Sequence, residues 1–183
     1  MLKIRRNISR VIILSLVSLL VLSSCSTKKN KWNRRVYHNL TSHYNVWWNG
    51  EQSIKDGEKT LKESVKDDFT KVLPVFNYGS KEDALALNSH MDRAIEKSSI
   101  CIQRHSMRFN GKEYVKWIDD AYLSMAKANF YKQDYIPARR TFDYIVNSYK
   151  TDPNSYNASL WLAKTYIETE QYHKAEALLQ ALI

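Results

Sequence analysis

The sequence has few of the residues that form tight turns, disulfide bonds or metal sites. Its 183 residues include only 4 glycines, 3 prolines and 2 cysteines. So few turn-forming residues argue against a sandwich or barrel of many short strands. Two cysteines are too few for a disulfide scaffold or a cysteine-rich zinc module. The hydrophobic fraction of 44% and the 12 tyrosines indicate a folded domain instead.

Positive charge is concentrated at the start of the chain. The formal charge is +9, from 28 lysines and arginines against 19 acidic residues. Residues 1–40 contain bases and no acid, whereas residues 41–183 are neutral overall. A nucleic-acid-binding protein carries its basic surface on the folded body. We therefore predict no nucleic-acid partner.

Residues 1–24 have the pattern of a signal peptide. A basic segment, 1–10, precedes an apolar stretch, 11–22, whose helical length of about 18 Å is too short to span a bilayer. Ser23 and Ser24 then precede Cys25, an arrangement that resembles the bacterial lipobox. The resemblance implies that Cys25 is acylated and becomes the mature N-terminus, held in the membrane by its lipid. The alternative is an ordinary secretory signal with a chance cysteine.

A short basic tether, residues 25–34, follows the predicted anchor. Its lysines and arginines, with Trp32, suit contact with anionic head groups, but a solvated tether explains them equally well. The residue after Cys25 is Ser26 and not aspartate. By the sorting rule of enterobacteria, this resembles an outer-membrane destination.

The rest of the chain reads as an all-α protein. Apolar residues recur at helical spacing and no segment alternates with period two. The pattern predicts helices over about 35–48, 51–71, 80–109 and 113–132, with a turn at Asn49-Gly50 and a loop over 73–79. Ser80 and Asp83 form a weak capping box at the third of these helices. In the first, Tyr37, Leu40, Tyr44, Trp47 and Trp48 fall along one side.

An internal repeat is the most specific feature of the body. Tyr135 and Ala138 align with Tyr172 and Ala175 at an offset of 37 residues, and Asp152-Pro153 between the copies suits a helix start. The small and aromatic positions resemble the tetratricopeptide repeat. The resemblance implies a helix-turn-helix solenoid with two repeats in residues 113–183, in an array that continues beyond residue 183. Residues 35–112 are then a helical region with degenerate, repeat-like helix pairs.

The same resemblance implies a partner-binding groove on the first helix of each repeat. Lys127 and Lys164 occupy equivalent positions and form a short basic ladder. Phe130, Tyr131 and Ile167 line the trough beside them. Such a groove suits a protein segment with apolar anchors and an acidic residue. Ordinary half-exposed helix residues are the alternative explanation.

The sequence contains no catalytic or metal-binding motif that we recognise. Asp119 and Asp120 are adjacent, so on a helix their side chains diverge by about 100° and suit a solvated face better than an acid–base pair. Cys101 and His105 share a helix face, but two ligands do not make a structural zinc site, and a buried Cys101 is expected. We predict no enzyme activity, no cofactor and no metal.

A closer resemblance appears after the lipobox. Residues 37–50, with Tyr37-His38-Asn39-Leu40 and Trp48-Asn49-Gly50, resemble the start of the tetratricopeptide lipoproteins of gliding motility and type IX secretion, the SprE/PorW group. This implies an outer-membrane lipoprotein facing the periplasm, an adaptor between the secretion translocon and the periplasmic ring. The alternatives are a repeat lipoprotein of the outer-membrane protein assembly machine and, third, a glycan-capturing uptake lipoprotein.

Overall fold

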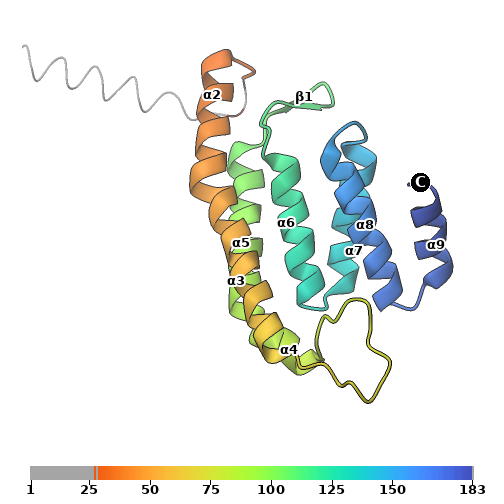
Figure 1. Cartoon of the computed structure of the whole chain (residues 1–183). Coiled ribbons are helices and arrows are strands. Elements are labelled where there is room, and N and C mark those ends of the chain that lie inside the picture. The colour runs from red at the N-terminus through yellow and green to blue at the C-terminus, as the bar shows by residue number, and fades with distance from the viewer. Residues whose placement is uncertain (1–26, 28, 183) are drawn as a thin grey trace, which may run out of the picture.

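The computed structural model describes Thr27 and residues 29–182, which are mostly helical (Figure 1). The predicted signal peptide, residues 1–24, and Cys25, the predicted lipidation site, lie outside these residues. The elements are α2 (Trp32–Thr41), the π-helix η1 (Ser42–Trp47), α3 (Trp48–Ser64), α4 (Lys81–Ala86), α5 (Asn88–His105), β1 (Arg108–Phe109), β2 (Lys112–Glu113), α6 (Ile118–Tyr131), α7 (Tyr135–Ser148), α8 (Pro153–Glu168) and α9 (Tyr172–Gln180). The all-α prediction is confirmed.

The first three elements form one long helical segment, which packs beside α5 (Figure 1). The predicted turn at Asn49-Gly50 is wrong, and so is the idea of a helix pair within residues 35–70. Gly50 is buried against α5, and a Cβ atom at this position would lie 3.6 Å from the Ala94 carbonyl oxygen. At Gly57 a Cβ would collide with the Met91 methyl group and lie 3.3 Å from His90 Cβ. Glycine here brings two helices together instead of ending one.

Helix α3 ends at Ser64, earlier than predicted, and residues 65–80 form a long loop. Phe69, expected on the apolar side of the helix, lies in this loop and is exposed. The loop ends where the sequence predicted, at Ser80. The Ser80 Oγ accepts from the Asp83 backbone N–H at 3.2 Å, and the Asp83 carboxylate accepts from the Ser80 backbone N–H at 2.8 Å. The predicted capping box is therefore confirmed.

The single helix predicted over 80–109 is divided in the structure. Helices α4 and α5 meet at Leu87, and a two-stranded hairpin, β1–β2, replaces the last predicted turn. Asn110 and Gly111 both have positive φ angles in the hairpin turn. The Glu113 carboxylate accepts from the Ser106 hydroxyl at 2.6 Å and stabilises the bend after α5. Two-residue strands are too short to show a period of two in the sequence.

The repeat predicted in the last third is visible in the backbone. Gln133 and Glu170, which are 37 residues apart, both have left-handed φ angles, of 59° and 58°. The backbone N–H of each donates to the carbonyl three residues earlier, at 2.8 and 3.0 Å. The next residues, Asp134 and Gln171, each donate a backbone N–H to the carbonyl five residues earlier. Consecutive helices from α6 to α9 pack against each other. The four alanines of the repeat pattern are buried: Ala126, Ala138, Ala163 and Ala175.

Helix α8 begins as the sequence predicted. Asp152 accepts a hydrogen bond from the Asn154 backbone N–H at 3.0 Å, and Pro153 takes the first helical position. The core of this region contains Phe130, Phe142 and Leu162. This core supports the groove between α6 and α8.

Candidate partner-binding groove

Two lysines and one tryptophan form the centre of the groove between α6 and α8. Lys127 Nζ lies 5.3 Å and Lys164 Nζ 4.5 Å from the centre of a Trp161 ring. The predicted pairing of equivalent lysines is thus present, and each ammonium group contacts an aromatic face. Within residues 29–182 neither lysine is in an ion pair. Burial, and then the charge of Lys127, lower the pKa of Lys164.

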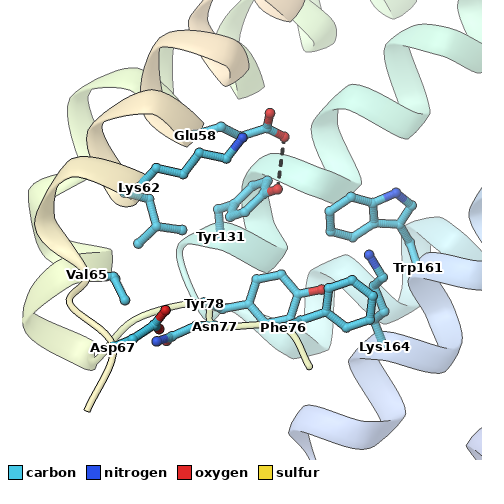
Figure 2. A pocket seen from close by; sticks show the side chains of 11 residues that line it. Glu58, Lys62, Val65, Asp67, Phe76, Asn77, Tyr78, Tyr131, Trp161 and Lys164 are labelled. Carbon is cyan, nitrogen blue, oxygen red and sulfur yellow. Dashed lines mark hydrogen bonds between the residues drawn. The ribbon is translucent and has the colours of Figure 1, made fainter. Parts of the chain in front are cut away.

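The aromatic pair predicted to face a partner is buried instead. Phe130 is 1% exposed and Tyr131 is 8% exposed. Phe130 lies edge-on to Trp161, with ring centres 5.2 Å apart. The Tyr131 hydroxyl donates to Glu58 on α3 at 2.9 Å, as the dashed line in Figure 2 shows. The expected exposure is wrong because α3 and the following loop cover this side of α6. Phe130 lies beneath the groove, whereas Tyr131 still lines a cavity beside Glu58 (Figure 2).

Ile167 does reach the surface as predicted, with 43% of the residue exposed. It lies on α8 one turn beyond Lys164. Leu160, one turn before Lys164, is exposed to a similar extent. Of the five predicted groove residues, Lys164, Ile167 and Tyr131 line a cavity of the groove, whereas Lys127 is half-buried and lines none, and Phe130 is buried.

A segment of the chain itself already lies in the groove. Phe76 of the loop places its ring 4.2 Å from Lys164 Nζ, and Tyr78 meets Phe130 edge-on at 4.8 Å. The Gln133 side chain donates to the Ser80 carbonyl at 3.2 Å and holds the end of the loop. Figure 2 shows Phe76 and Tyr78 side by side facing Lys164 and Trp161. Neither aromatic was predicted to lie in the groove, although two aromatic residues in a predicted loop were a signal.

The loop divides the groove into two cavities that share Phe76, Trp161 and Lys164. One, of about 400 Å³, extends towards α3 and is lined by Glu58 and Val65 (Figure 2). The other, of about 350 Å³, is mainly apolar and lies towards α9. Its further lining residues are Asn157, Leu160, Ala163, Ile167 and Leu179. The second cavity therefore offers mainly apolar contacts beside the Lys164 ammonium group, whereas the first also contains the Glu58 carboxylate and the Tyr131 hydroxyl.

The adjacent acids, Asp119 and Asp120, are not on a solvated face as predicted. Asp119 is 5% exposed, and the Asn154 side-chain amide donates to both carboxylates, at 2.7 and 3.0 Å. Burial raises the pKa of Asp119 to about 7, despite the hydrogen bond from Asn154, and the neighbouring charges of Asp120 and Asp152 add to the rise. These contacts join α6 to the start of α8.

Cys101 is fully buried, as predicted, and burial raises the pKa of its thiol to about 12. His105 contacts His38 and not a metal partner: their Nδ1 atoms are 3.0 Å apart, in a shared hydrogen bond between α5 and α2. Both rings are buried, and the pKa of His105 falls to about 4 because of desolvation first and the nearby His38 second. Among Thr27 and residues 29–182, no three histidine, cysteine or acidic side chains are arranged to hold a metal ion.

In the part of the chain that the structure describes, no helix is both long and apolar enough to cross a bilayer. No protein-family model matches the chain, and no curated protein matches it.

Proposed function

We propose that this protein is a non-catalytic, lipid-anchored adaptor of the outer membrane that binds a protein segment in the groove between α6 and α8. We further propose that it serves type IX secretion and gliding motility, linking the translocon to the periplasmic ring. The observation that carries the binding role is the pair Lys127 and Lys164 on Trp161. The likeness of residues 37–50 to that secretion family supports the cellular role.

The two lysines favour an acidic partner segment. They are half-buried, they repel one another, and no carboxylate of residues 29–182 pairs with either. An incoming Asp, Glu or terminal carboxylate would relieve that repulsion and accept hydrogen bonds from both. Apolar side chains beside it would fill the cavity next to Ile167 and Leu160.

A site-specific crosslink in the native envelope tests this role. A photo-crosslinking residue at Ile167 reports on the groove, and one at Tyr156 is a matched control, exposed on the same helix but outside both cavities. We expect mass spectrometry to find translocon or ring proteins at Ile167 and not at Tyr156. Capture of only the outer-membrane insertion machine would favour the assembly factor, and capture of glycan would favour the uptake lipoprotein.

Substitutions in the groove test the chemistry separately. Lys164→Ala together with Ile167→Ala should weaken partner capture by about 1–4 kcal/mol and leave helicity unchanged. Lys150→Ala, on an exposed turn, is the control and should bind normally. Hydrolysis of any envelope polymer by the purified protein would contradict a non-catalytic role.

The anchor is tested on its own. Cys25→Ala should yield an unprocessed or soluble protein, and the parent should incorporate labelled fatty acid at Cys25. If the parent incorporates none, or if the variant still partitions into detergent as the parent does, the lipid anchor is wrong. The groove experiments do not depend on this result.

A further inference from the structure

Helix α2 and the π-helix η1 bury polar side chains and expose a row of large apolar ones. The side packed against the bundle carries His38, Ser42 and Val46, all buried. The opposite side, two residues out of phase, presents five apolar side chains that are 40–77% exposed: Trp32, Val36, Leu40, Tyr44 and Trp48. We call these five residues the outer stripe. The spacing placed Leu40, Tyr44 and Trp48 along one side of the first predicted helix, and in the structure these three side chains are exposed.

Specific hydrogen bonds hold the helix in this orientation. His38 shares a hydrogen bond with His105 on α5 at 3.0 Å. The Asn39 side chain donates to the Tyr114 carbonyl at 3.0 Å and accepts from the Lys116 backbone N–H at 2.8 Å. Rotating the helix to bury the outer stripe would break all three bonds. The stripe is therefore directed outwards by the fold, which is the usual mark of a surface that another body covers.

The charge around the outer stripe is of one sign. Residues 1–50 contain no aspartate or glutamate, and Lys29, Lys31 and Arg35 flank the start of the stripe. The Arg35 guanidinium lies 4.0 Å above the Tyr114 ring. Along the stripe runs an open groove of about 540 Å³, lined by stripe residues together with Arg35, Asn39, His43, Tyr114 and Trp117. A surface that binds the outer stripe would therefore need both apolar groups and negative charge.

We infer that the outer stripe lies on the surface of a bilayer that contains anionic phospholipids, with α2 and η1 parallel to the membrane plane. Tryptophan and tyrosine with flanking lysine and arginine are the side chains of helices that lie in the interface. A basic stripe without any acid suits a lipid surface better than a protein surface, where charges of both signs normally alternate. The stripe also begins seven residues after Cys25, the predicted lipid attachment.

The outer stripe and the partner groove are separate surfaces. Figure 1 shows α2 and the loop 65–80 at opposite ends of the long helical segment. The groove lies between α6 and α8 beside that loop, and no residue of the outer stripe lines either of its cavities. The inference does not require the proposed secretion role.

Tryptophan fluorescence on vesicles tests the contact. The full chain is bound to vesicles of phosphatidylethanolamine and phosphatidylglycerol (3:1) that carry brominated acyl chains, which quench only tryptophans in contact with lipid. Trp32 and Trp48 lie about 24 Å apart along the helix, so quenching of both requires the helix to lie flat. We expect Trp32→Phe and Trp48→Phe each to remove part of the quenching. Trp161→Phe, in the partner groove, should remove none.

The result at Trp48 is decisive. Lipid attached at Cys25 brings Trp32 near the membrane in any orientation, but it does not do so for Trp48. If Trp48→Phe leaves the quenching unchanged, or if aqueous iodide reaches Trp48 in the vesicle-bound protein, the inference is overturned. A protein crosslinked at Tyr44 in the native envelope, in place of lipid, would overturn it as well.

Negative charge introduced on the outer stripe completes the test. Leu40→Glu with Tyr44→Glu should reduce the quenching at Trp48 by at least half, while Gln52→Glu, exposed further along the helical segment, should not. Both variants should keep the parent's far-ultraviolet circular dichroism, because the altered side chains are exposed. Replacing phosphatidylglycerol with phosphatidylcholine should also lower the quenching. Equal quenching on the two lipid mixtures would overturn the role of anionic lipid.

Discussion

The N-terminal helical segment and the C-terminal helix pairs bury different kinds of side chain. In α6–α9 the buried side carries small and apolar side chains, such as Ala126, Phe142 and Ala158. In α2 and η1 the buried side carries His38 and Ser42, and leucine, tyrosine and tryptophan face outwards. Apolar spacing therefore shows that a helix has two sides, but it does not show which of them faces the core.

The two regions also bring helices together differently. In the helix pairs, alanines at equivalent positions allow close packing, and large rings such as Phe142 and Trp161 fill the space beside them. Helix α3 uses glycine: Gly57 lies against Met91 on α5 with no space for a Cβ. Alanine packing keeps helix propensity high, whereas glycine lowers it by about 1 kcal/mol.

The largest expected effect comes from emptying the core of the helix pairs. Phe142 is fully buried, and Phe142→Ala should lower the free energy of unfolding by about 3–5 kcal/mol, from lost burial and the cavity left behind. Its repeat equivalent, Leu179, is 37% exposed. Leu179→Ala should cost much less in the same urea titration followed by circular dichroism. Equal losses would contradict the burial difference between the two copies.

The next effect is that of pH, and the two regions should respond in opposite directions. The pKa of His105 is about 4 in the folded protein against an ordinary 6.5, so the unfolded chain binds protons first as the pH falls. Stability from this region is complete above about pH 6.5 and is lost towards pH 4, by up to about 3 kcal/mol. The pKa of Asp119 is raised, to about 7 from 3.8, so over the range from 7 to 4 acidification favours the folded form there.

Variants separate these two contributions. Replacing His38 and His105 together by leucine should remove the loss of stability between pH 7 and 4.5, measured as the free energy of unfolding at each pH. Asp119→Asn should instead remove the opposing gain, so its stability should fall more steeply on acidification than that of the parent. If both variants follow the parent's pH profile, neither buried group controls stability in this range.

The helix pairs were predictable because local and global signals agree there. The offset of 37 residues, the alanines and the Asp152-Pro153 start all follow from periodicity and capping, and the structure confirms them. In the groove, Lys127, Lys164 and Ile167 were placed by that same register. Phe130 and Tyr131 were not, because their burial depends on α3 and the loop, which are distant in sequence and have no matching pattern.

The N-terminal region was less predictable for a related reason. Asn49-Gly50 is a strong local turn signal, but tertiary contact with Ala94 and Lys97 keeps the backbone helical there. The end of α3 at Ser64 has no glycine or proline to mark it. Nothing local distinguishes an apolar stripe that faces a core from one that faces outwards.

Overpacking should have an intermediate effect that again differs between the regions. Ala138 is fully buried, and Ala138→Leu should cost about 1–3 kcal/mol, while Lys150→Leu on the surface should cost little. Gly50→Ala should instead stabilise α3 by about 0.5–1 kcal/mol, because its Cβ would meet Lys97 Cβ at an ordinary 3.4 Å. Thermal unfolding of the three variants checks this order. A destabilised Gly50→Ala would show that α3 and α5 are closer than these distances indicate.

The smallest expected effect tests the comparison most directly. If the outer stripe were core, as its spacing suggested, Leu40→Gln would cost at least 2 kcal/mol, as buried leucines do. Because Leu40 is 54% exposed, we expect a change within about 0.5 kcal/mol in urea unfolding without vesicles. Val46→Gln, on the buried side, is the matched control and should destabilise clearly. A large loss at Leu40 and a small one at Val46 would mean that the helix is rotated, and the membrane contact would lose its basis.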